Sequence, residues 1–163
     1  MDFTLSVKTI EYASKLQAFL DSEVFPAEAV YEKQRHELIA SGKPHALPAV
    51  VEDLKKKARA LGLWNLFLPH NSDPHHGLSV TEYATLAEIT GWSPEIAPEA
   101  INCAAPDTGN MELLDMFGTD EQKKTWLEPL LEGRIRSAFA MTEPDVASSD
   151  ARNIRTSITT EGN

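Results

Sequence analysis

The stretch from residue 138 to residue 150, AFAMTEPDVASSD, concentrates the side chains best suited to bind a ligand. It passes from strand-forming residues into a loop that offers the Thr142 hydroxyl, the Glu143 carboxylate and two adjacent serines, Ser148 and Ser149. A loop of this kind at a strand end can hydrogen-bond the polar edge of a flat ring, or hold a pyrophosphate with backbone dipoles in place of basic side chains. On these residues alone, a polar turn between two strands is the favoured alternative.

The five histidines do not predict a metal site. His70, His75 and His76 share a short stretch with Asp73, but neighbouring histidines in a loop do not direct two ligands to one point. His36 and His45 are isolated, and the single cysteine, Cys103, excludes a cysteine-based zinc site. We therefore expect solvated histidines and no metal.

Other common catalytic arrangements find little support. Glu28 and Glu32 have helical spacing, but they lie on a polar stretch where a solvated face is expected instead of an acid–base pair. The chain contains neither GxGxxG nor GxxxxGK[ST], and no serine or cysteine lies in a nucleophile-elbow motif. No catalytic residue is predicted within these residues.

The composition limits the class of protein. The 163 residues are 42% hydrophobic and 25% charged, with a net charge of −10, which is typical of a folded chain and disfavours DNA or an anionic membrane as partner. No stretch reaches the roughly 20 apolar residues of a membrane span, and no secretory signal opens the sequence. We expect a cytoplasmic, bacterial-like protein; a mitochondrial or peroxisomal location stays open if the source is eukaryotic.

Helices are predicted to position the 138–150 stretch. Apolar residues recur at three-to-four spacing over 4–24, and Pro26 either breaks this helix or opens the next one, over 27–39. The clearest stripe is that of Leu47, Val51, Leu54, Ala58 and Leu61, with the lysines and arginine between them, Lys55 included, turned mostly to water. Gly62 is predicted to end this helix, and residues 63–68 to fill the core.

The second half of the helical part is marked by caps. Ser79 with Glu82, and Thr119 with Gln122, have the spacing of capping boxes that open helices over 80–90 and 120–132. The sequence predicts a loop over 71–77, before the first of these boxes. Between the two boxes it predicts a short helix from Glu99 and another over 111–117.

The character changes at residue 135. Residues 135–142 and 153–160 have the length and composition of strands, and the chain ends in hairpin-turn residues, Glu161 to Asn163. Two strands alone are marginally stable in water. We therefore expect a helical domain over 1–134 and the start of a truncated β domain over 135–163; a frayed tail is the alternative.

These residues resemble the acyl-CoA dehydrogenases. Met141-Thr142-Glu143-Pro144, followed by Ser149-Asp150, is similar to the flavin-binding motif of that family. The upstream runs 105–112 (APDTGNME), 117–119, 122–123 and 126–130 are similar to its preceding helices, so the resemblance covers essentially the whole chain. Four residues separate Pro144 from Ser149-Asp150, one more than in the common pattern, and without glycine. This variant resembles the sub-branch that includes phosphotransferase-fused members.

The resemblance implies a mainly α fold: the N-terminal helical bundle of an acyl-CoA dehydrogenase, followed by the first strands of an incomplete β domain. It implies FAD as cofactor, a fatty acyl-CoA as substrate, an electron-transfer flavoprotein as partner and a homo-oligomer, dimer or tetramer, at full length. In such enzymes a carboxylate removes the α-proton while the β-hydride passes to the flavin. Carried over by position, the cofactor-binding residues are Phe139, Ala140, Met141, Thr142, Ser148 and Ser149, and Ser149 also lies on the substrate side.

The same resemblance places the catalytic base outside these 163 residues, which are therefore expected to be inactive alone. Two alternatives remain at this point. One is a catalytically dead helical module that binds a protein partner; the other is an acyl-CoA oxidase or flavin monooxygenase of the same fold.

Overall fold

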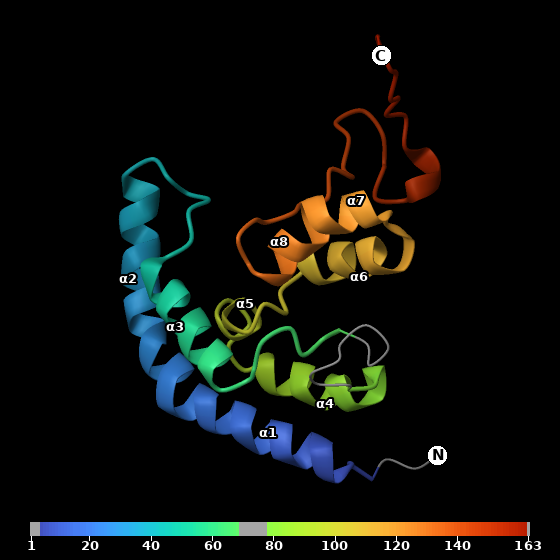
Figure 1. Ribbon diagram of the computed structural model, residues 1–163. Coiled ribbons are helices and arrows are strands. Elements are labelled where there is room, and N and C mark those ends of the chain that lie inside the picture. Colours follow the sequence, from blue (N-terminus) through green and yellow to red (C-terminus); the bar gives the residue numbers. More distant parts are fainter. Residues whose placement is uncertain (1–3, 69–77, 163) are drawn as a thin grey trace.

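Helices joined by loops make up most of the described chain as far as residue 131, and the segment after it is irregular apart from one short 3-10 turn (Figure 1). The structure, a computed structural model, describes residues 4–68 and 78–162. Its elements are α1 (Val7–Phe19), the π-helix η1 (Leu20–Val24), α2 (Phe25–Ala40), α3 (Ala49–Ala60), α4 (Val80–Thr90), α5 (Ala97–Ala100), α6 (Asp107–Phe117), α7 (Asp120–Gln122), the π-helix η2 (Lys123–Leu127), α8 (Glu128–Leu131) and the 3-10 turn η3 (Ala151–Asn153).

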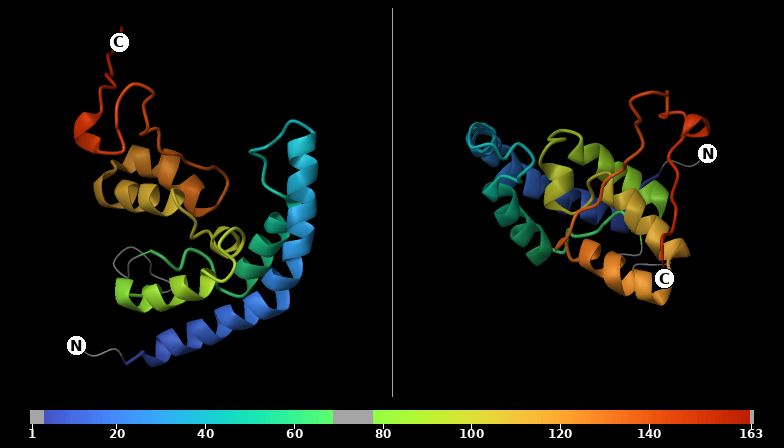
Figure 2. Two further views of the ribbon diagram at one scale, coloured as in Figure 1. Left: turned by 180° about the vertical axis from the view of Figure 1, so that it is seen from behind. Right: turned by 90° about the horizontal axis from the view of Figure 1, so that it is seen from above.

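The helices form two groups. In the first, α1, η1 and α2 make one continuous bent helix along an outer edge, with α4 packed on α1 and α3 packed on α2 (Figures 1 and 2). In the second, α6 packs against η2 and α8, and the short α5 lies between this group and α3. The last residues leave the second group on the side opposite α1.

One hydrophobic core joins the two groups. Leu16, Phe19 and Leu20 enter it from the long bent helix, and Val51, Leu54 and Ala58 enter it from α3. The segment 63–68 fills the centre as predicted, with Leu63 and Leu66 fully buried. Leu61 is the exception to the predicted α3 stripe, because it lies at the helix end and is 45% exposed.

Both π-helices come immediately before a proline. Pro26 lies in the first turn of α2 after η1, and Pro129 lies in the first turn of α8 after η2. Proline has no N–H for the i→i−4 bond, and its ring collides with the carbonyl of residue i−4, which in each case belongs to the π turn. The wider turn relieves that clash, so Pro26 opens α2 without interrupting the helix, one of the two predicted outcomes.

The predicted caps are confirmed. The backbone N–H of Glu82 donates to Ser79 Oγ over 3.2 Å, and the backbone N–H of Ser79 donates to Glu82 Oε2 over 2.8 Å. Thr119 and Gln122 make the same reciprocal pair. Gly62 follows α3 at a φ of 70°, a left-handed conformation that glycine adopts without strain.

The Glu82 carboxylate also ties α1 to α4, because Ser6 Oγ donates to its Oε1 over 2.6 Å. These hydrogen bonds from Ser6 and Ser79 lower the pKa of Glu82 from its ordinary value of 4.5 to about 2. The unfolded chain therefore takes up this proton at a higher pH than the folded chain does. The stabilisation is complete above about pH 5 and is lost as the pH falls towards 2.

We expect Glu82→Gln to remove this pH dependence. The effect should be about 1 kcal/mol in the free energy of unfolding, the scale of a partly exposed cap. Urea unfolding between pH 3 and pH 7 measures it, with Glu88→Gln on the exposed face of α4 as the control. If the free energy of unfolding changed equally with pH in Glu82→Gln and in the unsubstituted chain, the pH dependence would not come from Glu82.

Several predicted helix bounds are wrong. The helix predicted over 111–117 begins at Asp107, the one predicted from Glu99 begins at Ala97, and the one predicted over 120–132 is divided into α7, η2 and α8. Lys55, predicted to face water, is only 5% exposed. Its burial follows from an ion pair with Glu99, which no periodic pattern within α3 can reveal.

Within residues 78–162 the structure forms no β-strand, so the strands predicted over 135–142 and 153–160 are not formed there. A strand needs a neighbour to pair with its backbone groups, and the described part of the chain supplies none to these residues. Residues 151–162 are exposed throughout. The division at residue 134 and a β domain beyond it stay predictions.

Some predicted features lie outside the described residues, among them the loop over 71–77 and the histidines His70, His75 and His76. Within the described ranges, no helix is long and apolar enough to cross a membrane. The same ranges hold no cluster of His, Cys, Asp and Glu with the arrangement of a metal site. Glu28 and Glu32 are exposed, as predicted for a solvated face.

Candidate functional site

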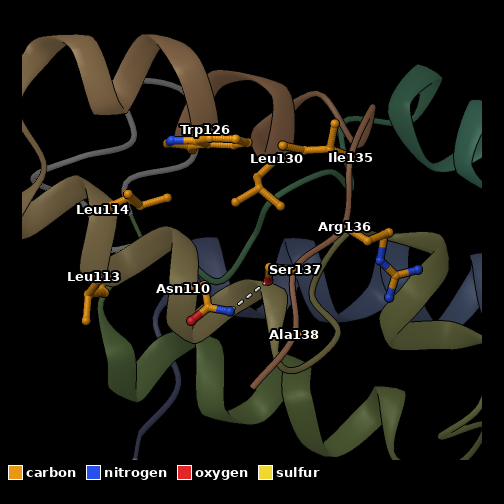
Figure 3. A pocket seen from close by; sticks show the side chains of 9 residues that line it. All are labelled: Asn110, Leu113, Leu114, Trp126, Leu130, Ile135, Arg136, Ser137 and Ala138. Atoms are coloured by element: carbon orange, nitrogen blue, oxygen red, sulfur yellow. Dashed lines mark hydrogen bonds between the residues drawn. The ribbon is translucent and has the colours of Figure 1, made fainter. Parts of the chain in front are cut away.

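A groove of about 420 Å³ lies between α6, η2, α8 and the segment that follows them (Figure 3). Its walls are mainly apolar: Leu114, Trp126, Leu130 and Ile135. Asn110 and the backbone of residues 136–138 form its polar end, where Arg136 turns away from the groove. The groove therefore combines an apolar wall with polar groups at one end, the composition of many small-molecule sites.

The four adjacent residues predicted to bind the cofactor leave this groove as a segment with neither helix nor strand. Phe139 is 66% exposed and Met141 is 39% exposed, and Ala140 and Thr142 are exposed as well. A Cβ on Gly109 would lie 3.9 Å from Phe139 Cζ, so the aromatic ring rests near the start of α6. These four residues thus present an aromatic face, a hydroxyl and main-chain groups on one accessible segment.

The loop that follows is folded around the Glu143 carboxylate. This carboxylate accepts hydrogen bonds from the backbone N–H groups of Arg155 and Thr156 and from the Thr156 hydroxyl. The hydrogen bonds, that from the Thr156 hydroxyl first, lower the pKa of Glu143. Glu143 therefore holds the two ends of the loop together.

The two predicted serines differ in their surroundings. Ser148 is fully buried, and its hydroxyl accepts a hydrogen bond from the backbone N–H of Glu143 over 2.6 Å. Ser149 is exposed. Ser148 thus stabilises the loop in this conformation, while Ser149 is free to face a ligand; direct contact of either with a cofactor stays a prediction.

Asp107 fastens the start of this segment to α6. Its Oδ1 accepts hydrogen bonds from the Ser137 backbone N–H over 2.7 Å and from the Ser137 hydroxyl over 2.6 Å, and its Oδ2 accepts one from Arg136 Nε over 2.7 Å. Asn110 Nδ2 donates to the same Ser137 hydroxyl over 2.8 Å. Asp107 is only 4% exposed, so these bonds form away from competing water.

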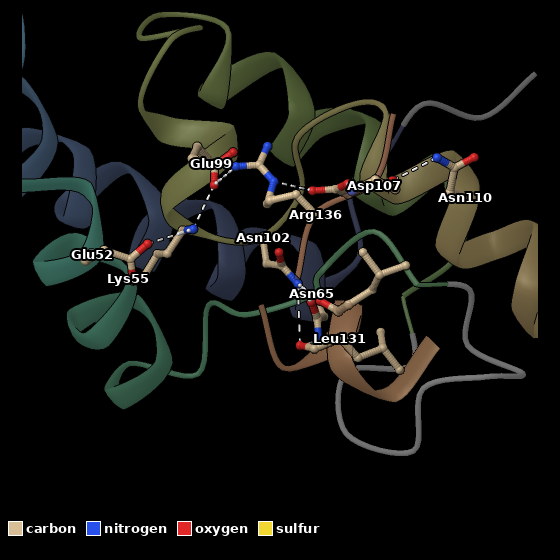
Figure 4. Close-up of polar contacts among 11 residues, drawn as sticks. Glu52, Lys55, Asn65, Glu99, Asn102, Asp107, Asn110, Leu131 and Arg136 are labelled. Atoms are coloured by element: carbon tan, nitrogen blue, oxygen red, sulfur yellow. Dashed lines mark hydrogen bonds and ion pairs between the residues drawn. The ribbon is translucent and has the colours of Figure 1, made fainter. Parts of the chain in front are cut away.

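The Asp107 contacts continue into a chain of ion pairs (Figure 4). Arg136 Nη1 lies 2.8 Å from Glu99 Oε1, which is 2.7 Å from Lys55 Nζ, and Lys55 also pairs with Glu52. The Lys55 and Glu99 side chains are 7% and 12% exposed, whereas that of Glu52 is 56% exposed. This series of ion pairs links α3, α5 and α6 to Arg136, the residue that precedes Ser137.

Two asparagines close the C-terminal end of α8. Asn65 and Asn102 adopt left-handed backbone with φ of 60° and 55°. Asn65 Nδ2 donates to the Leu131 carbonyl over 2.9 Å, and Asn102 Nδ2 donates to the Leu130 carbonyl over 3.1 Å and to Asn65 Oδ1 over 2.6 Å. The Leu130 carbonyl also accepts from the Gly133 backbone N–H over 2.9 Å, so the asparagines add side-chain hydrogen bonds to the carbonyls at this helix end.

We expect Asn102→Ala to lower the free energy of unfolding by about 2 kcal/mol, because the Leu130 carbonyl and the Asn65 amide oxygen each lose a hydrogen bond and alanine adopts a positive φ poorly. Urea unfolding measures the loss. Asn153→Ala, in the exposed turn η3, is the control and should change little. Equal effects of the two substitutions would contradict a closing role for Asn102.

The sequence predicts the segment 139–142 as a cofactor contact, but it does not single out the residues that anchor this segment. Asp107, Arg136 and Ser137 had no role assigned, although Asp107 stands in the quoted run 105–112. The only sequence signal for Asp107 is its place at the start of a helix. Carboxylates are common there because they interact favourably with the helix dipole, so this signal does not indicate a contact with a distant residue.

Comparison with known proteins gives consistent matches. The sequence profile of the "Acyl-CoA dehydrogenase, N-terminal domain" matches residues 9–134. The Mycobacterium tuberculosis protein named as a probable acyl-CoA dehydrogenase, FadE2, is 58% identical over 162 residues, which are 99% of this chain and 38% of that protein. Mouse acyl-CoA dehydrogenase family member 10 is 55% identical over 151 residues, which are 90% of this chain and 14% of that protein.

A solved structure gives the same result for the fold. The protein is from Mycobacterium abscessus, is assigned to the acyl-CoA dehydrogenases, and superposes with a TM-score of 0.80 at 49% identity. The match covers 91% of this chain and 37% of that one. The chain thus spans less than two fifths of the length of these relatives.

Proposed function

Because the chain belongs to the acyl-CoA dehydrogenase family, we propose that it forms the N-terminal helical part of an FAD-dependent enzyme that dehydrogenates fatty acyl-CoA thioesters between the α and β carbons. The observation that carries the proposal is the exposed segment 139–142 beside the apolar groove. The helical fold itself is that of the family.

The residues present fit a flavin. An isoalloxazine ring needs an apolar contact on its face and hydrogen-bonding groups at its polar edge, and FAD when bound supplies the acceptor for the hydride. Phe139 and Met141 offer apolar surface, while Thr142 offers a hydroxyl and the main chain of 139–142 offers amides and carbonyls. Ser149, exposed on the following loop, is the proposed contact to the pyrophosphate, the ribityl chain or the thioester side.

This chain's own contribution is to hold and orient. The helical core fixes α6, and α6 fixes the segment that presents the binding groups. We place the base that removes the α-proton, and most of the acyl-CoA surface, in the rest of the parent protein. An electron-transfer flavoprotein as acceptor, a homo-oligomeric state and a cytoplasmic location complete the proposal.

The cofactor assignment is tested on the parent protein, the longer polypeptide that we propose contains this chain. Thr142→Val removes one hydroxyl hydrogen bond at constant shape, so the dissociation constant for FAD should rise about fivefold. Flavin fluorescence quenching on titration of the apoprotein measures it. Thr81→Val, on the exposed side of α4, is the matched control; equal affinities in both variants would contradict the assignment of Thr142.

The 163-residue chain alone should neither oxidise an acyl-CoA nor retain FAD through gel filtration. The reason is that the segment 139–142 supplies only part of a flavin site, and the chain spans 38% of the relative FadE2. Reduction of a ferrocenium acceptor and the flavin absorbance of the purified 18 kDa species measure the two properties. A yellow and active species of that mass would contradict the proposal that the catalytic base and part of the flavin site lie in the rest of the parent protein.

A further inference from the structure

Arg136 and Ser137, which come shortly before the segment 139–142, both donate hydrogen bonds to the Asp107 carboxylate. This carboxylate binds the backbone N–H and the hydroxyl of Ser137 and the guanidinium of Arg136. Ser137 precedes Phe139 by two residues, so its position fixes where the segment starts.

We call the contacts of Asp107 with Arg136 and Ser137 the Asp107 clamp. Its α6 side is anchored in the hydrophobic core. Asp107 is the first residue of α6, whose Met111 is fully buried in the core. Asn110, one turn further along, donates to the Ser137 hydroxyl that Asp107 also holds. Asp107 and Asn110, both on α6, thus bind the same Ser137 hydroxyl. Arg136 forms ion pairs with both Asp107 and Glu99.

Past Ser137 these restraints stop. No hydrogen bond from the backbone N–H groups of residues 138–142 to the described part of the chain is found, and Phe139 is 66% exposed. The clamp is therefore the last fixed point before the groups proposed to meet the cofactor.

We propose that Asp107, with Ser137, is a positioning residue that sets the orientation of the segment 139–142 for FAD. This inference rests on the proposed function. Asp107 does not touch the cofactor; it acts through the backbone of Ser137. A segment already held in its binding conformation pays less conformational entropy when a ligand binds, so loss of the clamp should weaken FAD binding.

The test uses the parent protein with Asp107→Asn, which keeps the shape of the side chain but replaces one acceptor oxygen by an NH₂ group. Hydrogen exchange of the Ser137 amide in the apoprotein, the amide that Asp107 accepts from, should become at least about tenfold faster, as read by mass spectrometry of overlapping peptides over 135–143. The dissociation constant for FAD should rise by about tenfold or more, and the visible spectrum of the bound flavin should lose resolved structure.

Two further variants make the result decisive. Ser137→Ala removes only the hydroxyl contacts and should give a smaller rise, about threefold, which keeps the inference testable if Asp107→Asn fails to fold. Glu52→Gln, at the exposed end of the same chain of ion pairs, is the matched control and should change neither exchange nor affinity.

The outcomes separate the two claims. Parent protein that binds no FAD contradicts the proposed function and, with it, this inference. Parent protein that binds FAD with equal affinity in Asp107→Asn, Ser137→Ala and Glu52→Gln contradicts the inference alone. A uniform loss of thermal stability with unchanged affinity of the folded fraction would reduce Asp107 to a structural residue and also overturn the inference.

Discussion

Glu99→Gln should lower the free energy of unfolding by about 3 kcal/mol, because it leaves the buried Lys55 ammonium with a single, half-exposed partner. Lys55 Nζ lies 2.7 Å from Glu99 Oε1 and 3.2 Å from Glu52 Oε1, and only the Glu52 side chain is well hydrated. Removing one partner of a buried pair costs more than removing the charge itself.

Lys55→Met is the informative counterpart. It deletes the buried charge at similar volume, while Glu99 keeps its pair with Arg136 at 2.8 Å. We expect this variant to lie within about 1 kcal/mol of the unsubstituted chain. Urea unfolding at neutral pH compares the two, and a larger loss for Lys55→Met than for Glu99→Gln would show that the ion pair is net stabilising.

Leu66→Ala should cost about 4 kcal/mol, since it deletes a fully buried side chain at the centre of the core. This is a large part of the roughly 5–15 kcal/mol by which domains are stable. The segment 63–68 follows α3 and has no regular structure of its own. We therefore expect neighbouring atoms to collapse only partly into the cavity.

Leu61→Ala is the matched control for Leu66→Ala. The sequence pattern places Leu61 on the buried stripe of α3, but it is 45% exposed, so its truncation should cost about 1 kcal/mol or less. Urea midpoints of both variants measure the difference. Similar losses would mean that Leu61 is more buried in solution than in this structure.

Local signals predicted most of the helical fold. The capping boxes at Ser79 and Thr119 and the glycine at residue 62 mark helix ends because their hydrogen bonds close within a few residues. The apolar segment 63–68 was placed in the core correctly, because burial is the only favourable environment for so many apolar side chains.

Features that depend on distant residues were missed. Lys55 is buried because Glu99 meets it from α5, and Asp107 closes on Ser137 across the second helical group. The π turns before Pro26 and Pro129 are a further case, because proline alone does not say whether a helix breaks or widens. Each of these outcomes is set by tertiary packing.

In the candidate site, too, local sequence gives a prediction, whereas contacts between distant residues could not be foreseen. A short motif predicts that residues 139–142 bind the cofactor, because the family resemblance ties that motif to a flavin, and this assignment stays a prediction. The burial of Ser148 could not be predicted, because its hydroxyl is enclosed only when the loop folds back around Glu143. Strand pairing could not be predicted either, because it depends on residues with which 135–142 would have to pair.

The exposed residues 138–142, whose backbone N–H groups make no hydrogen bond to the described part of the chain, have a practical consequence at the bench. Proteases bind substrates as extended strands, so a hydrated segment with neither helix nor strand is cut without unfolding, whereas the packed helices resist. Brief digestion with a nonspecific protease should therefore trim the polypeptide back to the residue where Asp107 still holds it. The stable remnant, weighed by mass spectrometry, would show how far the self-supporting unit extends.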